Sequence, residues 1–489
     1  MSKLLRGGRI ASVRKDIANF TSSMKDDLVL SDAIININRA HVMMLLKQNI
    51  ISHVTGVTLL KVLASFSAKS LNPSSEDIHM ALEEAVLQKT GENIGGNLHI
   101  AKSRNDQIAT AIRIQLRKQI LNSTNNILKL QKSLLSTAEK HINTIILEYT
   151  HLQPAQPVTF AHYLLSVIDK LERDLQRLIE TYERVNFCPL GAGALATTSF
   201  KINRNYVAQL LGFDEVLENS IDAVGSRDFI LETLGVFTIL SVNLSRLAED
   251  LIVWSSTDFN VVELPDNFAS TSSIMPQKKN PEPLEIIRAN ASKVLGDFVT
   301  SSSTLKGLPS TYNLDFQQIT PNLWNSIEIV NTSLFILSEL IPNLKLTNDV
   351  SDKALNSFVA ATELANFLTR NYKIPFRTAH KIVGSLVNSL ITNNLTFKDL
   401  TPKMLQNVSE NITNRKIKVS DKQIDDCLDL HKLVNSHNVK GGPAPAEVKR
   451  ALSERKKLLI QSQTKLSSLT QKLIKAQKIL ESKISIFIT

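Results

Sequence analysis

A proline-rich segment between residues 270 and 285 concentrates side chains that could perform acid–base chemistry. It reads Ser-Thr-Ser-Ser-Ile-Met-Pro-Gln-Lys-Lys-Asn-Pro-Glu-Pro-Leu-Glu, and its three prolines exclude a regular helix or a central strand. Lys278 and Lys279 could supply charge to a bound anion, and Asn280 could supply directional hydrogen bonds. A serine hydroxyl among cations could also serve as a base, because positive neighbours favour its ionised form. A solvated surface loop is the alternative.

Two other segments place polar groups beside long apolar stretches. Residues 98–107 read Leu-His-Ile-Ala-Lys-Ser-Arg-Asn-Asp-Gln, which predicts a helix N-terminus that could bind an anion through its free N–H groups. An ordinary helix cap formed by Ser103 or Asn105 is the alternative. His151 follows Thr150 and comes shortly before a proline-rich turn. It could transfer a proton near neutral pH or be a structural histidine, while Thr150 could donate to a carboxylate.

Two turns complete the set of candidate segments. Residues 220–228 predict a turn that opens a long helix. Arg227 in this turn could be catalytically relevant, but we favour an ion pair with Asp222 or Asp228. Residues 306–317 interrupt a helix with polar groups that could grip a guanidinium or an amide.

Long helices must position these segments. Across 489 residues the chain is 43% hydrophobic but only 5% aromatic, with 16 glycines, which favours a helical protein. Apolar residues recur at helical spacing in five long windows, so we predict a central helical bundle that other subunits complete. The first helix would have about 40 residues and a length of about 60 Å. We predict an N-terminal helical domain (1–107), a central bundle domain (108–360) and a C-terminal helical domain (361–489).

The composition of the chain limits the classes of protein to which it can belong. Cys188 and Cys427 cannot form a disulfide framework, and no Cys/His spacing predicts zinc, so we expect a reducing, cytoplasmic setting. No apolar run approaches the ~18 residues of a membrane span, and we expect no membrane partner. The basic N-terminal residues hint at a transit peptide, which we do not favour. A net charge of +10 permits binding of small carboxylates or of nucleic acid.

Taken together, these segments resemble the argininosuccinate lyase family of the fumarase/aspartase superfamily, in the same order along the chain. The segment 270–285 is the superfamily signature loop, and its Gln-Lys-Lys-Asn-Pro wording resembles this branch most closely. The Ser-Arg-Asn-Asp-Gln stretch at 103–107 and Leu-Pro-Ser-Thr-Tyr-Asn at 308–313 favour it over adenylosuccinate lyase, fumarase or aspartase. Further similar stretches from Leu4–Arg9 to Val439–Ala444 extend the resemblance over nearly the whole chain.

The resemblance implies an all-α, three-domain fumarase/aspartase-like fold whose central long-helix bundle forms a 20-helix core in a homotetramer. It implies β-elimination of argininosuccinate to L-arginine and fumarate, as in arginine biosynthesis and the related urea cycle, with no cofactor and no metal. Each active site would be shared between three subunits. This fits helices too long to bring both ends of one chain together.

The resemblance also implies residue roles. Ser272 would be the base, Lys278 would hold the developing anion, and His151 would transfer a proton or position a carboxylate with Glu285 as its partner. The implied substrate-binding residues are Asn280 at the developing anion, Ser103, Arg104, Asn105 and Thr150 around the fumarate portion, and Ser23, Asp27, Tyr312 and Gln317 near the arginine portion.

Four departures from the family pattern concern specificity. Thr271 replaces a glycine before the two serines, which removes backbone freedom from the loop. Residues 100–102 read Ile-Ala-Lys where Thr-Gly-Arg is usual, and Leu314 and Thr320 each stand where a lysine is common. One alternative is therefore a fumarate-releasing lyase for another N-substituted succinate. Others are a non-catalytic crystallin-like relative and, from net charge alone, a nucleic-acid-binding protein.

Overall fold

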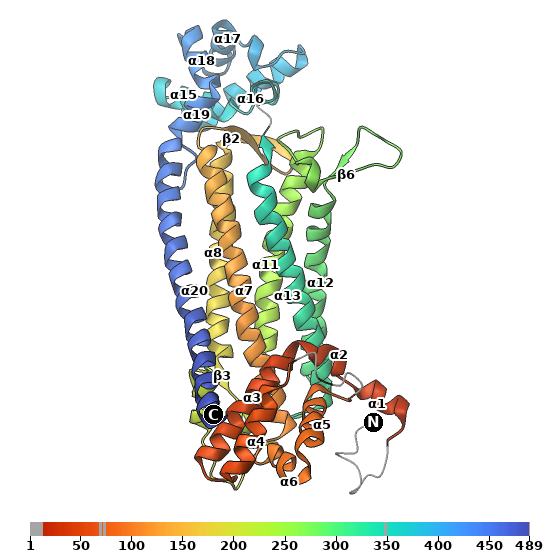
Figure 1. Cartoon of the computed structure of the whole chain (residues 1–489). Helices are drawn as coiled ribbons and strands as arrows, with labels where there is room; N and C mark the ends of the chain where they lie inside the picture. The colour runs from red at the N-terminus through yellow and green to blue at the C-terminus, as the bar shows by residue number, and fades with distance from the viewer. Residues whose placement is uncertain (1–12, 68–70, 72–74, 347–349, 489) are drawn as a thin grey trace.

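Five long helices form the centre of the molecule in a computed structural model that describes residues 13–67, 71, 75–346 and 350–488. Their apolar residues recur at three- and four-residue spacing, so each helix buries a continuous stripe against its neighbours. The bundle, drawn in orange to teal in Figure 1, confirms the predicted all-α class. It comprises α7 (Arg104–Lys140), α8 (Phe160–Val185), α11 (Asp228–Ser255), α12 (Glu282–Leu305) and α13 (Thr320–Leu340).

The longest of these five helices, α7, sets the height of the bundle. Its 37 residues span about 55 Å at 1.5 Å per residue. Ser103 begins it with a capping box, in which the Ser103 side chain and the Asp106 carboxylate each satisfy a backbone N–H at the helix start. Segments before and after α7 therefore lie at opposite ends of the bundle.

Short helices cover the lower end of the bundle, in the orientation of Figure 1. Asp77 caps α5 by accepting a hydrogen bond from the Met80 N–H, as its position before the helix predicted. The helices on the N-terminal side are α1 (Lys15–Thr21), α2 (Met24–Asp27), α3 (Ser31–Lys47), α4 (His53–Ala64), α5 (Ile78–Thr90) and α6 (Glu92–Gly95); α9 (Arg204–Leu210) and α10 (Ser220–Gly225) follow α8.

Short strand pairs connect the helices. An antiparallel hairpin of β1 (Ile145–Thr150) and β2 (Gln153–Thr159) crosses the upper end, with a register shift between Glu148 and Tyr149. The other pairs each contain two residues per strand. They are β3 (Phe187–Cys188) with β4 (Glu215–Val216), β5 (Val262–Glu263) with β8 (Lys345–Leu346), and β6 (Ser270–Thr271) with β7 (Lys279–Asn280).

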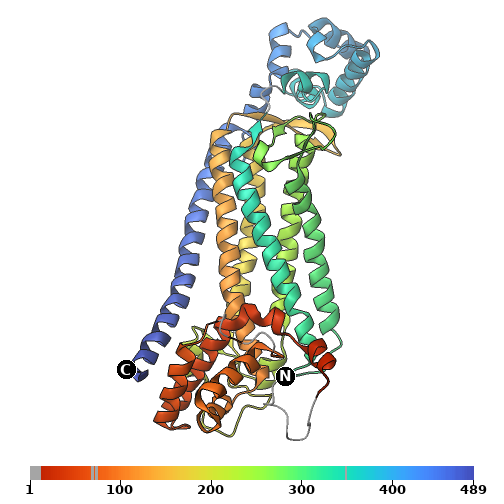
Figure 2. The same ribbon diagram turned by 45° about the vertical axis from the view of Figure 1, so that its right-hand side comes forward.

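A separate group of helices caps the upper end and has its own apolar core between Ala360 and Leu433. Figure 2 shows this group above the bundle and the N-terminal helices below it. Its members are α14 (Ser351–Asn356), α15 (Ala361–Tyr372), α16 (Phe376–Thr392), α17 (Pro402–Thr413), α18 (Asp421–Leu428) and α19 (Leu430–Ser436).

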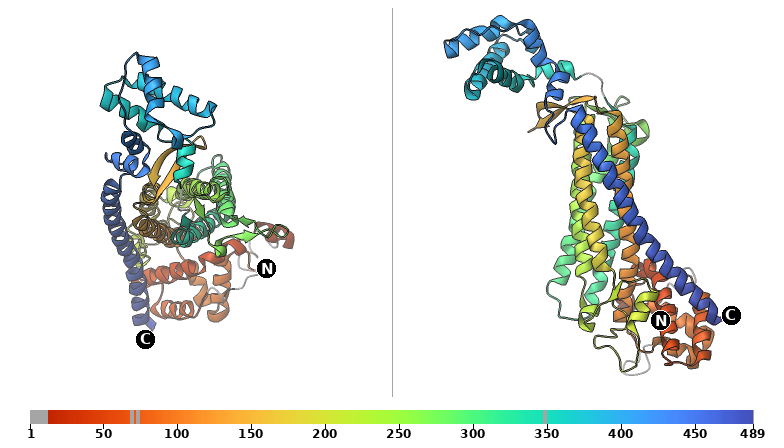
Figure 3. Two further views of the ribbon diagram at one scale, coloured as in Figure 1. Left: turned by 90° about the horizontal axis from the view of Figure 1, so that it is seen from above. Right: turned by 90° about the vertical axis from the view of Figure 1, so that its left-hand side faces the viewer.

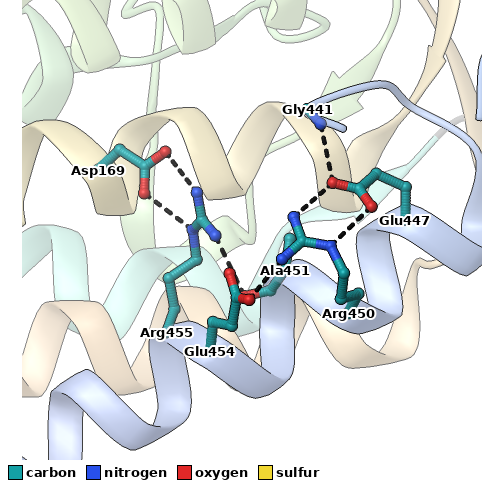
Figure 4. Close-up of polar contacts among 7 residues, drawn as sticks. All are labelled: Asp169, Gly441, Glu447, Arg450, Ala451, Glu454 and Arg455. Carbon is teal, nitrogen blue, oxygen red and sulfur yellow. Dashed lines mark hydrogen bonds and ion pairs between the residues drawn. The ribbon is translucent and has the colours of Figure 1, made fainter. Parts of the chain in front are cut away.

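The C-terminal helix α20 (Pro445–Ile488) leaves this group and runs back along the bundle to the N-terminal helices, as the right panel of Figure 3 shows. Arg455 fixes it to α8 through two hydrogen bonds of 2.8 and 2.7 Å to the Asp169 carboxylate, and Arg450 pairs with Glu447 beside them (Figure 4). Residues of α20 from Val448 to Ile484 join the main core. The domain limits at 107/108 and 360/361 stay predictions.

Two stretches are long and apolar enough on average to cross a membrane, which the run-length criterion did not reveal. They are Lys15–Lys47 and Asp228–Trp254. Their most apolar windows are 72% and 50% buried inside the structure, as in core helices, so their composition is only weak support for a membrane span.

Candidate active site

A small cleft of about 50 Å³ at the lower end of the bundle collects five of the predicted site residues. It lies where α2, the start of α5, the start of α7 and the segment after α12 meet. The predicted residues that line it are Ser23, Asp27, Arg104, Tyr312 and Gln317. Two segments that the sequence separates by almost 300 residues therefore form one surface.

Asp27 is the acidic group of this cleft, and it is only 6% exposed. Burial raises the pKa of its carboxyl to about 7, with a smaller contribution from the Asp77 and Asp26 charges, although the hydrogen bond from Ser23 Oγ opposes the shift. A carboxylate in this state gains from the arrival of a cationic group. The site therefore suits a ligand whose guanidinium or ammonium group enters beside Asp27.

Arg104 and Asp77 form an ion pair at the N-terminus of α7, with 2.8 Å between Arg104 Nη1 and Asp77 Oδ2. His79 lies beside them, 7% exposed, and neither ring nitrogen has a hydrogen-bond partner among the described residues. Burial lowers the pKa of His79 to about 4, so the ring is neutral near pH 7. His79, in the first turn of α5, was not among the residues predicted from the sequence.

The start of α7 confirms the cap interpretation for Ser103. Its Oγ accepts from the Asn105 N–H at 3.3 Å, and the Asn105 side chain donates to the Ala194 carbonyl at 3.0 Å. Asp106, fully buried, accepts from the Gly191 and Gly193 N–H groups at 2.9 Å each. Asp106 thus fixes the glycine-rich turn beside the helix start. A capping role does not exclude ligand binding at this end of α7, where the helix dipole favours anions.

Arg227 does not form the expected ion pair. Among the described residues it forms no ion pair with Asp222 or Asp228, and its Nη1 instead donates to the carbonyls of Val224 and Ser226. The ion-pair interpretation was wrong because the turn folds the side chain inward, where it is 2% exposed.

The signature loop lies at the upper end, where the β6–β7 hairpin projects from the bundle (Figure 1). Ser272 Oγ accepts hydrogen bonds from the N–H groups of Ile274 and Met275 at 3.3 and 3.0 Å. Lys278 is exposed on the loop, whereas Lys279 pairs with Glu263 and Asp266. Both lysines are exposed, and among the described residues Lys278 is the one of the two that forms no ion pair.

His151 occupies the tip of the β1–β2 hairpin with Leu152, and both have positive φ angles of 57° and 58°. Positive φ at both central residues characterises a type I′ turn, where Asn and Gly are preferred. Histidine and leucine adopt this backbone at a cost, and such strain is common at functional sites. Thr150, His151 and Glu285 are all exposed, and His151 does not hydrogen-bond to Glu285 in the described chain.

Of the residues that depart from the family pattern, Lys102 and Thr320 are buried, whereas Leu314 and Thr271 are exposed. Lys102 is buried, hydrogen-bonds to the Asn38 side chain and does not line the cleft. Thr320 lines the cleft, but its Oγ1 donates to the Phe316 carbonyl at 3.3 Å. Leu314 is 48% exposed and Thr271 is exposed at the base of the signature loop.

The candidate residues thus form two groups, one at each end of the ~55 Å helix α7. Neither group alone has a base, an anion-binding group and a cleft for the remainder of a substrate. No group of three or more His, Cys, Asp or Glu side chains suitable for a metal ion occurs in the part of the chain that the structure describes.

Comparisons with known proteins agree with this arrangement. The family description Lyase matches residues 15–296, and Argininosuccinate lyase C-terminal matches residues 358–435. The argininosuccinate lyase of Methanocaldococcus jannaschii is 42% identical over 486 residues, which cover 98% of this chain and 99% of the relative. The chain belongs to the argininosuccinate lyase family. The argininosuccinate lyase of Methanosarcina barkeri is also 42% identical, over 93% of both chains.

Solved structures support the same fold for this lyase. An EDDS lyase in complex with formate has a TM-score of 0.86 and 30% identity, over 94% of this chain and 92% of that chain. A class II fumarase from Schistosoma mansoni has a TM-score of 0.70 at 17% identity, over 84% and 91% of the two chains, which supports the fold alone. The fumarase/aspartase-like fold is therefore established.

Proposed function

We propose that this lyase cleaves argininosuccinate by β-elimination to L-arginine and fumarate, as a step of arginine biosynthesis. Full-length similarity to argininosuccinate lyases carries the proposal. The acidic cleft around Asp27 supports it, because a guanidinium substrate needs a carboxylate beside it.

In the proposed reaction, Ser272 removes the proton beside a carboxylate of the succinyl portion. The resulting carbanion spreads its charge into that carboxylate, which Lys278 and Asn280 stabilise. The C–N bond then breaks, the electron pair forms the double bond of fumarate, and the leaving nitrogen takes up a proton. His151, paired with Glu285, takes part in this proton transfer or positions the carboxylate.

The remaining predicted residues bind the substrate in this proposal. Asp27 and its hydrogen-bond donor Ser23 face the cationic part of the arginine portion, with Tyr312 and Gln317 beside them. The start of α7 and the hairpin tip hold the fumarate portion, through Ser103, Arg104, Asn105 and Thr150. No metal or cofactor is needed in this scheme.

We also propose a homotetramer in which three subunits contribute to each site. Only four of the 24 residues of α12 are buried in the single chain, against 22 of 37 in α7. Large apolar residues are exposed on α11, α12 and α13, and exposed apolar surface of this kind is typical of interfaces. They are Ile239, Val242, Ile286, Leu295, Val299 and Phe335.

Packing these faces together antiparallel would bring the upper end of one subunit beside the lower end of another. We further propose that the protein is cytoplasmic and has no nucleic-acid or membrane partner. In this proposal, other copies of the chain cover the exposed apolar residues.

Fumarate release tests the reaction. The purified protein is given argininosuccinate, adenylosuccinate or aspartate, and fumarate is followed by its ultraviolet absorbance. Release from argininosuccinate alone supports the proposal, whereas release only from another substrate contradicts it and favours a different N-substituted succinate.

Mixing inactive variants tests the shared site. Ser272→Ala and Asp27→Asn alter opposite ends of the bundle, so reassembled mixtures should contain sites with both residues intact, about a quarter of the total for random assembly. Mixing Ser272→Ala with Lys278→Ala is the control, because both changes lie on one loop and no site escapes them. Equal activity in the two mixtures would contradict sharing between subunits.

A further inference from the structure

Arg227 lines the cleft, and two of its guanidinium nitrogens lack a hydrogen-bond partner among the described residues. Its Nη1 donates to the Val224 carbonyl at 3.1 Å and to the Ser226 carbonyl at 2.7 Å. Its Nε and Nη2 are buried and have no hydrogen-bond partner in the described part of the chain. The guanidinium carbon lies 4.4 Å from the centre of the Phe316 ring, which fixes the plane of the group.

The free edge has the geometry that binds a carboxylate. Nε–H and Nη2–H lie in the guanidinium plane and point in parallel from the same edge, so two carboxylate oxygens can accept from them together. Burial without an anionic partner lowers the pKa of Arg227 to about 10, yet the group remains charged near neutral pH. A buried cation with two unused donors gains substantially when an anion arrives.

Among the described residues, the other charged groups of the cleft do not pair with the Arg227 guanidinium. Arg104 is paired with Asp77, and Asp27 accepts from Ser23. Among the described cleft residues, Arg227 is therefore the arginine without a carboxylate partner.

Thr320 increases the importance of this charge. The family pattern commonly has a lysine at this position, whereas the Thr320 hydroxyl here is uncharged and donates to the Phe316 carbonyl. On this side of the cleft, the cationic group that remains is Arg227, beside Tyr312 and Gln317.

We propose that Arg227 binds the α-carboxylate of the amino acid released from the substrate, through its Nε and Nη2. The inference rests on the proposed function, since it identifies which part of argininosuccinate the group recognises. Tyr312 and Gln317, which are predicted to lie near the arginine portion, line the same cleft as Arg227.

Product inhibition by two ligands tests this assignment. L-arginine has the α-carboxylate, whereas agmatine has the same guanidinium and amine without it. The wild-type enzyme should bind L-arginine about 10- to 100-fold more tightly than agmatine. Arg227→Met should remove most of that preference and leave agmatine binding unchanged, and Arg227→Lys should retain part of it because it keeps the charge but loses the paired donors.

Agmatine also reports on folding in each variant. If Arg227 only holds the turn together, both ligands weaken equally in Arg227→Met and Arg227→Lys, and the proposal is overturned. An unchanged preference for L-arginine in both variants overturns it as well. Wild-type protein that releases no fumarate from argininosuccinate would instead refute the proposed function, independently of the variants.

Discussion

Replacing Asp27 with asparagine should stabilise the folded protein at neutral and alkaline pH. The carboxyl is 6% exposed, and burial raises its pKa to about 7 from 3.8. Asparagine has nearly the same shape, and its side-chain oxygen can still accept the Ser23 hydrogen bond. The substitution thus removes a buried charge while preserving the packing.

The magnitude follows from the two pKa values. Below about pH 4, Asp27 is protonated in both states and costs nothing. Between pH 4 and 7 the unfolded chain loses the proton first, so the folded state binds more protons and its stability falls as pH rises. The difference of about three pH units between the two pKa values corresponds to about 4 kcal/mol, reached above pH 7.

Urea unfolding at one protein concentration and at pH 4.5, 6 and 8 measures this effect. The gain in free energy of unfolding for Asp27→Asn should grow from about 1 kcal/mol at pH 4.5 to about 4 kcal/mol at pH 8. Asp26→Asn is the matched control, because it removes the same charge from an exposed neighbour. A gain for Asp27→Asn that is equal at pH 4.5 and 8 would refute the assigned cost of burial.

Further predictions concern stability and turnover. Burial lowers the Lys102 pKa to about 7, so the folded protein holds a buried ammonium group below that pH. Lys102→Met should therefore raise the free energy of unfolding by at most roughly 5 kcal/mol below pH 7, and this gain should be lost as the pH rises toward 10.5. Unfolding at pH 6.5 and 10 checks this. Ser272→Ala should abolish fumarate release while native mass stays unchanged. The KM for argininosuccinate should rise below pH 7, where Asp27 gains a proton, as a pH series of wild-type kinetics would reveal. Arg455→Met should cost about 1 kcal/mol or less, an amount that added salt reduces in the wild type, as measured by urea unfolding.

The sequence predicted the long helices well because burial has a clear signal along a helix. Apolar residues at helical spacing predicted one long helix from Phe160 and another from about Arg227, and α8 and α11 begin at Phe160 and Asp228. Two further helices were expected after Pro283 and Pro321, but α12 and α13 each begin one residue before the proline, which lies in the first turn, where a missing N–H costs nothing.

Features that depend on tertiary contacts could not be read in the same way. Nothing in the local sequence distinguishes an Arg227 that pairs with Asp222 from one whose side chain turns inward onto Phe316. The sequence also did not predict that α20 runs back to the N-terminal helices, because an amphipathic pattern shows that a helix packs but not which elements it packs against. His151 in a tight hairpin was unexpected for the same reason, since its backbone is unusual for histidine.

The separation of the two groups of site residues follows from helix length alone. Ser272, Lys278 and His151 adjoin helix ends at the top of the bundle, whereas Asp27 and Arg104 adjoin ends at the bottom. A helix of ~55 Å cannot shorten, and closing the signature loop moves its tip far less than that distance. If one site needs both groups, the second group must come from another chain. The exposed apolar residues of α11, α12 and α13 then bear on catalysis, because a contact between chains that buried them would also determine where the base meets the substrate.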